Sequence, residues 1–269
     1  MINPTIEPER FPIDLPFITE TAHEAGQRAK AMLNTMQSDF KSDDSLVTNI
    51  DRTIEAFIKE RLNTRYPGYA FLGEETGLTE NKADPDAPLW AVDPIDGTTN
   101  MVYGIPIWGV SIGLIVGGEA IAGAFAMPMT DELFYGEKGK GSFCNEVRLK
   151  VTDRDADFHP EDPLCFTSTS LQQLPVSRLT GRLRCLGSIA ADIAYTGRGS
   201  FLSLVGWNER AYDIAAAVVI AREAGCVVRH FTGAEVNLGE VVANGGVSPS
   251  PFIVAPPKAA AYIVKRLTE

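Results

Sequence analysis

One stretch of the chain, residues 89–100, reads LWAVDPIDGTTN and marks the end of a buried strand. Residues 89–92 are all apolar, which predicts a strand buried on both faces, and Asp93 follows them directly. Pro94 restricts its own φ and removes one main-chain donor, while Gly97 permits a tight approach of the backbone. We therefore predict a strand that runs into a sharp turn at the edge of a sheet, where binding sites are common.

The predicted turn offers ligands for a cation and donors for an anion. Asp93, the carbonyl of Ile95 and Asp96 carry the oxygen atoms that Mg²⁺ prefers as ligands. Main-chain N–H groups at the start of the next helix suit a phosphate. The same residues, taken alone, also fit an acidic surface loop with a glycine corner. The buried strand before the turn favours the binding site over that simpler interpretation.

The spacing of the two aspartates argues against two other classes of enzyme. A haloacid-dehalogenase-type phosphatase has one residue between the aspartates of its Asp-x-Asp-Gly-Thr motif, whereas Pro94 and Ile95 both intervene here. An aspartic protease carries Asp-Thr-Gly, whereas residues 96–98 read Asp-Gly-Thr. Neither a covalent aspartyl phosphatase nor an aspartic protease is therefore predicted.

Further acidic residues stand at the ends of other predicted elements. Glu74 and Glu75 follow a predicted strand, and Asp51 and Asp213 each stand at the start of a predicted helix. Alone, each aspartate fits an ordinary acidic residue in the first turn of a helix, and Glu75 fits a local hydrogen-bonding role. Their occurrence together with the turn is what favours a metal site.

The rest of the chain predicts a mixed α and β architecture. Apolar residues recur at helical spacing in four segments, which are residues 18–36, 50–62, 211–224 and 258–267. Early hairpins followed by alternating strands and helices indicate layers. A charged loop at residues 153–163 suggests an N-terminal subdomain, residues 1–152, and a C-terminal subdomain, residues 153–269, that form one catalytic unit. The polar residues 38–45 predict a loop and a candidate mobile lid.

Composition restricts the partners and the compartment. The 269 residues have a net charge of −11, which argues against a nucleic-acid partner and against an anionic membrane surface. The four cysteines show no Cys-x-x-Cys pair and fit buried thiols in a reducing compartment. No signal peptide and no apolar run long enough for a membrane span is evident, so a cytoplasmic location is expected.

Several ordered motifs resemble the inositol monophosphatase family. Residues 90–100, WAVDPIDGTTN, resemble its first signature, and residues 212–216 with Glu223-Ala224-Gly225 resemble its second. Residues 73–75, 46–51 and 138–145 resemble its Gly-Glu-Glu segment, its Leu-Val-Thr-x-x-Asp segment and its hairpin region. The resemblance extends from about Ile18 to the C-terminus. It implies a layered αβαβα sandwich of the sugar-phosphatase type, which is an α+β fold, together with a homodimer and sensitivity to Li⁺.

The resemblance also implies a role for each matching residue. Two or three Mg²⁺ ions are expected on Glu74, Asp93, the Ile95 carbonyl, Asp96 and Asp213. Glu74, Thr98 and Asp51 are expected to orient the attacking water, and the N–H groups of Gly97 and Thr98 to hold the phosphate. Hydrolysis is then an in-line attack by a metal-activated water, without a phosphoenzyme.

Three departures from the family pattern leave every implied ligand in place. Met101 replaces an aromatic residue, Ser45 replaces an acidic residue, and Tyr212 replaces a tryptophan. Hydrolysis is therefore expected to survive them.

A fourth departure concerns the substrate. The inositol-selective branch of the family carries a Glu seven residues before the second-signature Asp, and Gly206 stands there in this chain. Residues 187–189, Gly-Ser-Ile, and Asp96 are expected to line the same wall. Residues 208–210 could substitute from the adjoining loop, and Arg210 would suit a second anionic group.

The leading hypothesis is a Mg²⁺-dependent phosphatase of small polyol or sugar phosphates, with myo-inositol 1-phosphate as first candidate. Fructose 1,6-bisphosphate and histidinol phosphate compete as substrates. A 3′-phosphorylated adenosine nucleotide is disfavoured, because Thr99-Asn100 stands where nucleotide-selective relatives more often carry Lys-Glu. A hypothesis of another class is a non-catalytic regulatory binding protein on the same scaffold.

Overall fold

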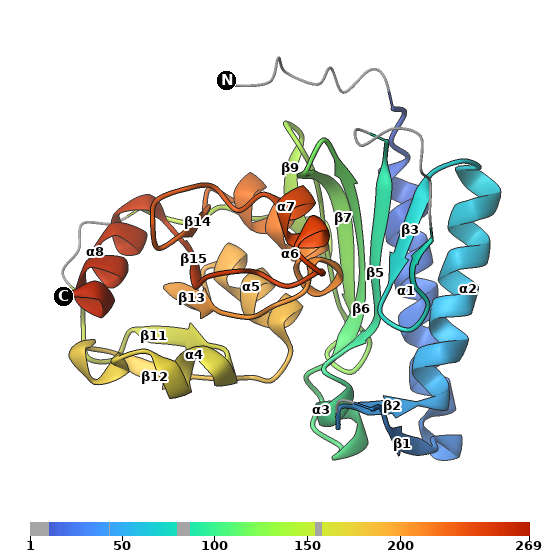
Figure 1. Ribbon diagram of the computed structural model, residues 1–269, viewed down its shortest axis with the longest axis horizontal. Helices are drawn as coiled ribbons and strands as arrows, with labels where there is room; N and C mark the ends of the chain where they lie inside the picture. The colour runs from blue at the N-terminus through green and yellow to red at the C-terminus, as the bar shows by residue number, and fades with distance from the viewer. Residues whose placement is uncertain (1–10, 43, 80–86, 154–157) are drawn as a thin grey trace.

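A computed structural model describes residues 11–42, 44–79, 87–153 and 158–269, and its layers form an αβαβα sandwich (Figure 1). The predicted layered α+β fold is therefore confirmed. One outer layer consists of helices α1 (Leu15–Met32) and α2 (Asn49–Arg65). These helices cover one face of the larger sheet, and their apolar residues pack there against Trp90, Val92 and Ile112.

Within the described residues, the larger sheet has eight strands. They are β3 (Ala70–Gly73), β4 (Gly77–Thr79), β5 (Leu89–Asp96), β6 (Gly109–Val116), β7 (Glu119–Met127), β8 (Glu132–Glu137), β9 (Gly141–Cys144) and β10 (Val147–Arg148). Their order is β10-β9-β8-β7-β6-β5-β3-β4. The pair β3 and β5 is parallel, so the carboxyl ends of these two strands lie side by side. Glu74 and Asp93 are brought to one edge of the sheet in this way.

Helices α5 (Ile189–Arg198) and α6 (Ala211–Glu223) form the middle layer, between the two sheets (Figure 1). Helix α6 lies unusually close to β6 and β7. A Cβ atom placed on Gly113 would lie 2.6 Å from the Ala215 Cβ, and one on Gly123 would lie 2.6 Å from the Ala216 Cα. Glycines on the sheet and alanines on the helix therefore set the distance between these layers, and so the position of Asp213 near the start of α6.

The second sheet, in the part of the chain that the structure describes, has five strands in the order β12-β11-β13-β15-β14. They are β11 (Pro163–Phe166), β12 (Arg182–Arg184), β13 (Ser203–Gly206), β14 (Val227–His230) and β15 (Phe252–Ala255). Helices α4 (Ser168–Gln173) and α8 (Pro257–Thr268) form the last layer. One apolar core joins residues of both sheets through α5 and α6. The division into subdomains at residue 152 stays a prediction.

Short elements complete the described chain. They are α3 (Thr98–Val102), α7 (Leu238–Ala243), the 3₁₀ turns η2 (Leu33–Thr35) and η3 (Val176–Arg178), and strands β1 (Ser38–Phe40) and β2 (Leu46–Thr48). The loop predicted at residues 38–45 is wrong in part, because β1 pairs with β2 as an antiparallel hairpin. Asp43 lies outside the described residues, as do residues 154–157 of the loop predicted at residues 153–163. Across the described ranges, no helix has the length and hydropathy needed to cross a membrane.

Candidate active site

Strand β5 ends in an irregular turn that carries the first group of predicted residues. Asp93 pairs with Ser111 and Asp96 with Gly109, so the register with β6 slips between the two aspartates. A bulge of this kind re-aims the side chains of a strand. The strand thus continues to Asp96 rather than ending at Val92 as predicted. Within the bulge, the Ile95 N–H donates to Asp93 Oδ1 at 2.9 Å.

Gly97 turns the chain from β5 into α3. Its φ is +94°, in the left-handed region that favours glycine. A Cβ at this position would also lie 3.0 Å from the Ile107 carbonyl oxygen. The next residue, Thr98, has its Oγ1 3.0 Å from Asp51 Oδ1 and 2.9 Å from the Ile95 carbonyl oxygen. The turn is therefore tied to the start of α2.

Asp51 is held in place by the cap of α2. The Thr48 N–H donates to Asp51 Oδ2 at 2.8 Å and the Asp51 N–H donates to Thr48 Oγ1 at 3.4 Å, which forms a capping box. The Thr48 hydroxyl also donates to Asp51 Oδ2, at 2.5 Å. Burial raises the pKa of Asp51, and the hydrogen bonds from Thr48 and Thr98 act against that rise. Asp51 therefore has both the capping role expected of a lone helical aspartate and a contact with the turn.

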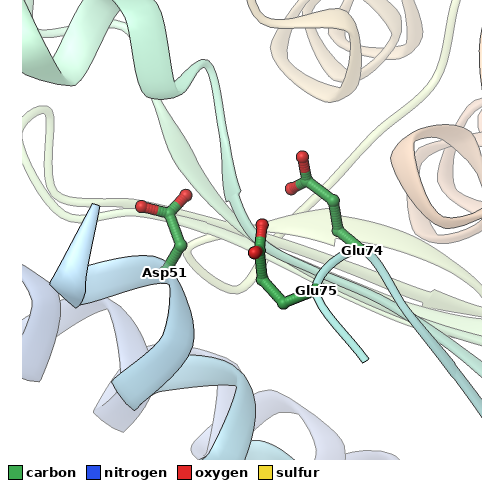
Figure 2. A group of neighbouring side chains, drawn as sticks. All are labelled: Asp51, Glu74 and Glu75. Carbon is green, nitrogen blue, oxygen red and sulfur yellow. The ribbon is translucent and has the colours of Figure 1, made fainter. Parts of the chain in front are cut away.

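Glu74 and Glu75 follow β3 and face Asp51 (Figure 2). One carboxylate oxygen from each of these three residues lies within 4.8 Å of the others. The Lys41 ammonium, from the β1–β2 hairpin, lies 2.8 Å from Glu74 Oε1 and 2.6 Å from Glu75 Oε1. These contacts raise the pKa of Lys41 although its burial acts in the opposite direction. Glu75, which the sequence left with a local role, thus belongs to the acidic group.

Glu55 supports this turn and was missed by the sequence analysis. Its two carboxylate oxygens accept hydrogen bonds from the N–H groups of Glu75 and Thr76, both at 2.8 Å. Gly73 leaves the room that this contact needs, because a Cβ there would lie 2.5 Å from the Glu55 Cδ. The spacing could have revealed Glu55, because it stands four residues after Asp51 on α2 and residues four apart are neighbours on a helix.

Asp93, Asp96 and Asp213 meet beside this group, where α5 and α6 begin. Asp96 accepts hydrogen bonds from the Ser188 hydroxyl and from the Ile189 and Ala190 N–H groups. Asp213 Oδ2 accepts the Arg210 N–H at 2.9 Å. The two aspartates therefore cap α5 and α6 while they face one cavity.

The charges of these carboxylates oppose one another. Burial raises the pKa of Asp96 to about 6, against the hydrogen bonds from Ser188 and the N–H groups of α5. Burial, and after it the charges of Glu74 and Asp96, hold the pKa of Asp93 well above its usual range. Burial raises the pKa of Asp213 in the same way, with Glu209 and Asp96 adding to the rise. Such a group fits a divalent cation, because carboxylate and carbonyl oxygens are the preferred ligands of hard metals and the ion offsets the repulsion.

A cavity of about 630 Å³ joins most of the predicted residues. Those that line it are Glu74, Asp93, Ile95, Asp96, Gly97, Thr98, Gly187, Ser188, Ile189 and Asp213. Asp51 is in contact with Thr98 rather than part of the lining. Asp192 lines the cavity too and was missed, because its position depends on the packing of α5 between the sheets.

Gly206 and Arg210 are not among the residues that line this cavity. Gly206 is buried at the end of β13, opposite Phe252 of β15. A Cβ there would lie 2.5 Å from the Phe252 ring, so the position has no room for a side chain. Glu209 does line the cavity. It belongs to residues 208–210, which were predicted to substitute for the glutamate missing at position 206.

Comparisons with known proteins show similarity to one family over most of the chain. The model of the inositol monophosphatase family matches residues 15–267. A fructose-1,6-bisphosphatase/inositol-1-monophosphatase of Thermotoga maritima is 34% identical over 196 residues, which cover 71% of this chain and 74% of that protein. An inositol-1-monophosphatase of Mesorhizobium japonicum is 35% identical over 226 residues, covering 80% of this chain and 84% of the other.

Solved structures show the same fold. A Thermotoga maritima IMPase superposes with a TM-score of 0.81 at 28% identity, over 94% of this chain and 96% of that one. The extragenic suppressor protein suhB of Bartonella henselae superposes with a TM-score of 0.82 at 25% identity, over 94% and 98% of the two chains.

Proposed function

Because the chain belongs to the inositol monophosphatase family, we propose that it catalyses the Mg²⁺-dependent hydrolysis of myo-inositol 1-phosphate to inositol and phosphate. More generally, it is a metal-dependent phosphoric monoester hydrolase that acts on a sugar or polyol phosphate. The cavity supports this proposal, because the carboxylates of both signature motifs meet there beside Gly97 and Thr98.

Two or three Mg²⁺ ions would be held by the predicted ligands. These are the carboxylates of Glu74, Asp93, Asp96 and Asp213 and the carbonyl of Ile95. When bound, such ions lower the pKa of a water molecule and stabilise the charge on the attacking and leaving oxygens. The raised pKa values of Asp93 and Asp213 support this assignment, since they reflect repulsion that a cation would relieve.

The residues of the turn orient the water and the phosphate. Donation from the Thr98 hydroxyl to Asp51 Oδ1 leaves the lone pairs of Thr98 Oγ1 to accept a hydrogen bond from the attacking water. Glu74, with one carboxylate oxygen within 4.8 Å of one of Asp51, would accept another. The N–H groups of Gly97 and Thr98 would hold the phosphate in line with that water.

A regulatory role without catalysis is the second candidate. It is favoured by one relative, the Nus factor SuhB of Pasteurella multocida, which is 35% identical over 206 residues. The four carboxylates Glu74, Asp93, Asp96 and Asp213 are all retained in the cavity of this chain. A protein that only binds partners has no need of them, so hydrolysis is the stronger proposal.

Phosphate release from purified protein tests the proposal. Myo-inositol 1-phosphate, fructose 1,6-bisphosphate and histidinol phosphate are compared with and without Mg²⁺, for the wild type and Asp213→Asn. We expect Mg²⁺-dependent turnover, fastest on myo-inositol 1-phosphate, and a loss of at least about a hundredfold in the variant. Equal turnover by the variant would show that the site is assigned wrongly, and no turnover on any of the phosphates would favour the regulatory role. The homodimer and the cytoplasmic location stay predictions.

A further inference from the structure

The segments after β11 contribute a second wall to the cavity, which we call the C-terminal wall. Its residues are Thr167, Ser168, Cys185, Asp192 and Glu209. The predicted metal ligands come mostly from the larger sheet, whereas this wall belongs to the smaller sheet and its helices. With the phosphate held at the turn of residues 93–98, as proposed above, the C-terminal wall would meet the alcohol that hydrolysis releases.

Glu209 is the carboxyl group of this wall that the fold positions from several sides. The preceding residue, Asn208, has a φ of +67°, so the chain turns sharply just before it. The Ser248 N–H donates to the Glu209 carbonyl oxygen at 2.7 Å, and Arg210 forms a bridge with Val247. The side chain of Glu209 is hydrogen-bonded to Thr167. Such a carboxyl group is pre-organised to meet a ligand.

The other acidic residue of the wall is already engaged within the protein. Asp192 is buried on α5, and its Oδ1 accepts a hydrogen bond from the Cys165 thiol at 3.1 Å. Burial raises the pKa of Asp192 to about 8 and that of Glu209 to about 7, and the charge of Asp96 adds to both. Glu209 is only half-buried, so it is the carboxyl group more open to a ligand.

The charge of the cavity favours some alcohols over others. Its lining, drawn from the described residues, holds seven carboxylates and no Lys, Arg or His side chain. A second phosphate on the substrate would therefore meet acidic groups with no basic side chain to receive it. Hydroxyl or ammonium groups would instead find carboxylate oxygens as acceptors.

We propose that Glu209 is the specificity-determining residue for the alcohol, accepting hydrogen bonds from its donor groups and selecting polyhydroxy or amino alcohol monophosphates over bisphosphates. The inference rests on the proposed hydrolysis and adds to it the recognition of the leaving group. Gly206 cannot take this role, since Phe252 occupies the space beside it.

Steady-state kinetics on four substrates tests this role. Myo-inositol 1-phosphate offers hydroxyl donors, histidinol phosphate offers an ammonium group, fructose 1,6-bisphosphate carries a second phosphate, and p-nitrophenyl phosphate releases an alcohol without a donor. The variants are Glu209→Gln and Glu209→Ala. Glu240→Gln serves as the matched control, because Glu240 is exposed on α7 and absent from the cavity lining. Thermal unfolding of each variant checks that it is folded.

We expect Glu209→Ala to raise the KM for the preferred donor substrate roughly tenfold, as loss of a hydrogen bond to a charged group predicts. The kcat/KM of this variant for the donor substrate, divided by its kcat/KM for p-nitrophenyl phosphate, should fall by a similar factor. Glu209→Gln should shift the ratio of kcat/KM values towards fructose 1,6-bisphosphate, because it removes a negative charge. If kcat/KM falls more for myo-inositol 1-phosphate, the donor is a hydroxyl group. If it falls more for histidinol phosphate, the donor is an ammonium group.

Two results would overturn the inference alone. One is an equal loss on all four substrates, which would make Glu209 a purely structural residue. The other is an unchanged KM for both donor substrates in folded Glu209→Ala. Wild-type protein that hydrolyses none of the four with Mg²⁺ would instead overturn the proposed function, and the inference with it.

Discussion

The Thr98 hydroxyl oxygen lies 3.0 Å from Asp51 Oδ1 and so connects the turn after β5 to the capped start of α2. The two residues stand far apart in the sequence, and the packing of α2 on the larger sheet brings them together. The contact joins two groups with different roles. Thr98 is expected to orient the attacking water, and the Asp51 carboxylate can accept the proton of the Thr98 hydroxyl.

Replacing Thr98 should therefore slow catalysis more than it weakens binding. We expect Thr98→Ala to lower kcat by about a hundredfold or more, the range typical of proton-transfer groups, with a small change in KM. Thr98→Ser keeps the hydroxyl and should recover most of the rate. Steady-state phosphate release measures both, and an alanine variant as fast as the wild type would remove Thr98 from the mechanism.

Glu55 should affect both stability and metal binding. Its carboxylate accepts the N–H groups of Glu75 and Thr76, and an amide would turn a donor towards one of them. We expect Glu55→Gln to lower the free energy of unfolding by roughly 1–3 kcal/mol and to weaken Mg²⁺ affinity. Urea unfolding and a Mg²⁺ titration measure the two effects. Glu60→Gln, exposed on the same helix, is the control, and equal behaviour of the two variants would contradict the role of Glu55.

Two glycine substitutions should change stability in opposite directions. Gly123→Ala places a Cβ 2.6 Å from the Ala216 Cα, and overpacking of this kind costs about 1–3 kcal/mol or more. Gly26→Ala, inside α1, places a Cβ no closer than 3.6 Å to its neighbours and should stabilise by about 0.5–1 kcal/mol. Thermal unfolding of both variants checks the close packing of α6, which a harmless Gly123→Ala would contradict.

The pH dependence of the metal-free protein should depend on Asp192. Burial raises the pKa of its carboxyl group from 3.8 to about 8. Between these values the folded state holds a proton that the unfolded state has lost, so stability falls as the pH rises. One such proton changes the free energy of unfolding by up to about 1.4 kcal/mol per pH unit. Asp192→Asn should flatten the profile between pH 4 and 8, measured by urea unfolding with a chelator. A profile as steep as that of the wild type would show that Asp192 does not carry this proton.

Local signals in the sequence predicted the elements that carry the cavity. The apolar residues before Asp93 predicted β5, and the motifs of the two signatures predicted the layered fold. The β1–β2 hairpin was missed because the side chains of residues 38–40 are all exposed and show no alternation. Glu55 and Asp192 were missed because their contacts depend on tertiary packing rather than on a motif. The crowding of Gly206 by Phe252 depends on the pairing of β13 with β15, which no local pattern reveals.

The location of bound metal decides whether these carboxylates form the metal site of a phosphatase. Crystals grown with Mn²⁺ in place of Mg²⁺ and with product phosphate would locate the ions by their anomalous scattering. We expect two or three peaks within coordination distance of Glu74, Asp93, the Ile95 carbonyl, Asp96 and Asp213, with phosphate against Gly97 and Thr98. Mn²⁺ bound only between Asp51 and Glu75, or no Mn²⁺ in the cavity, would contradict it.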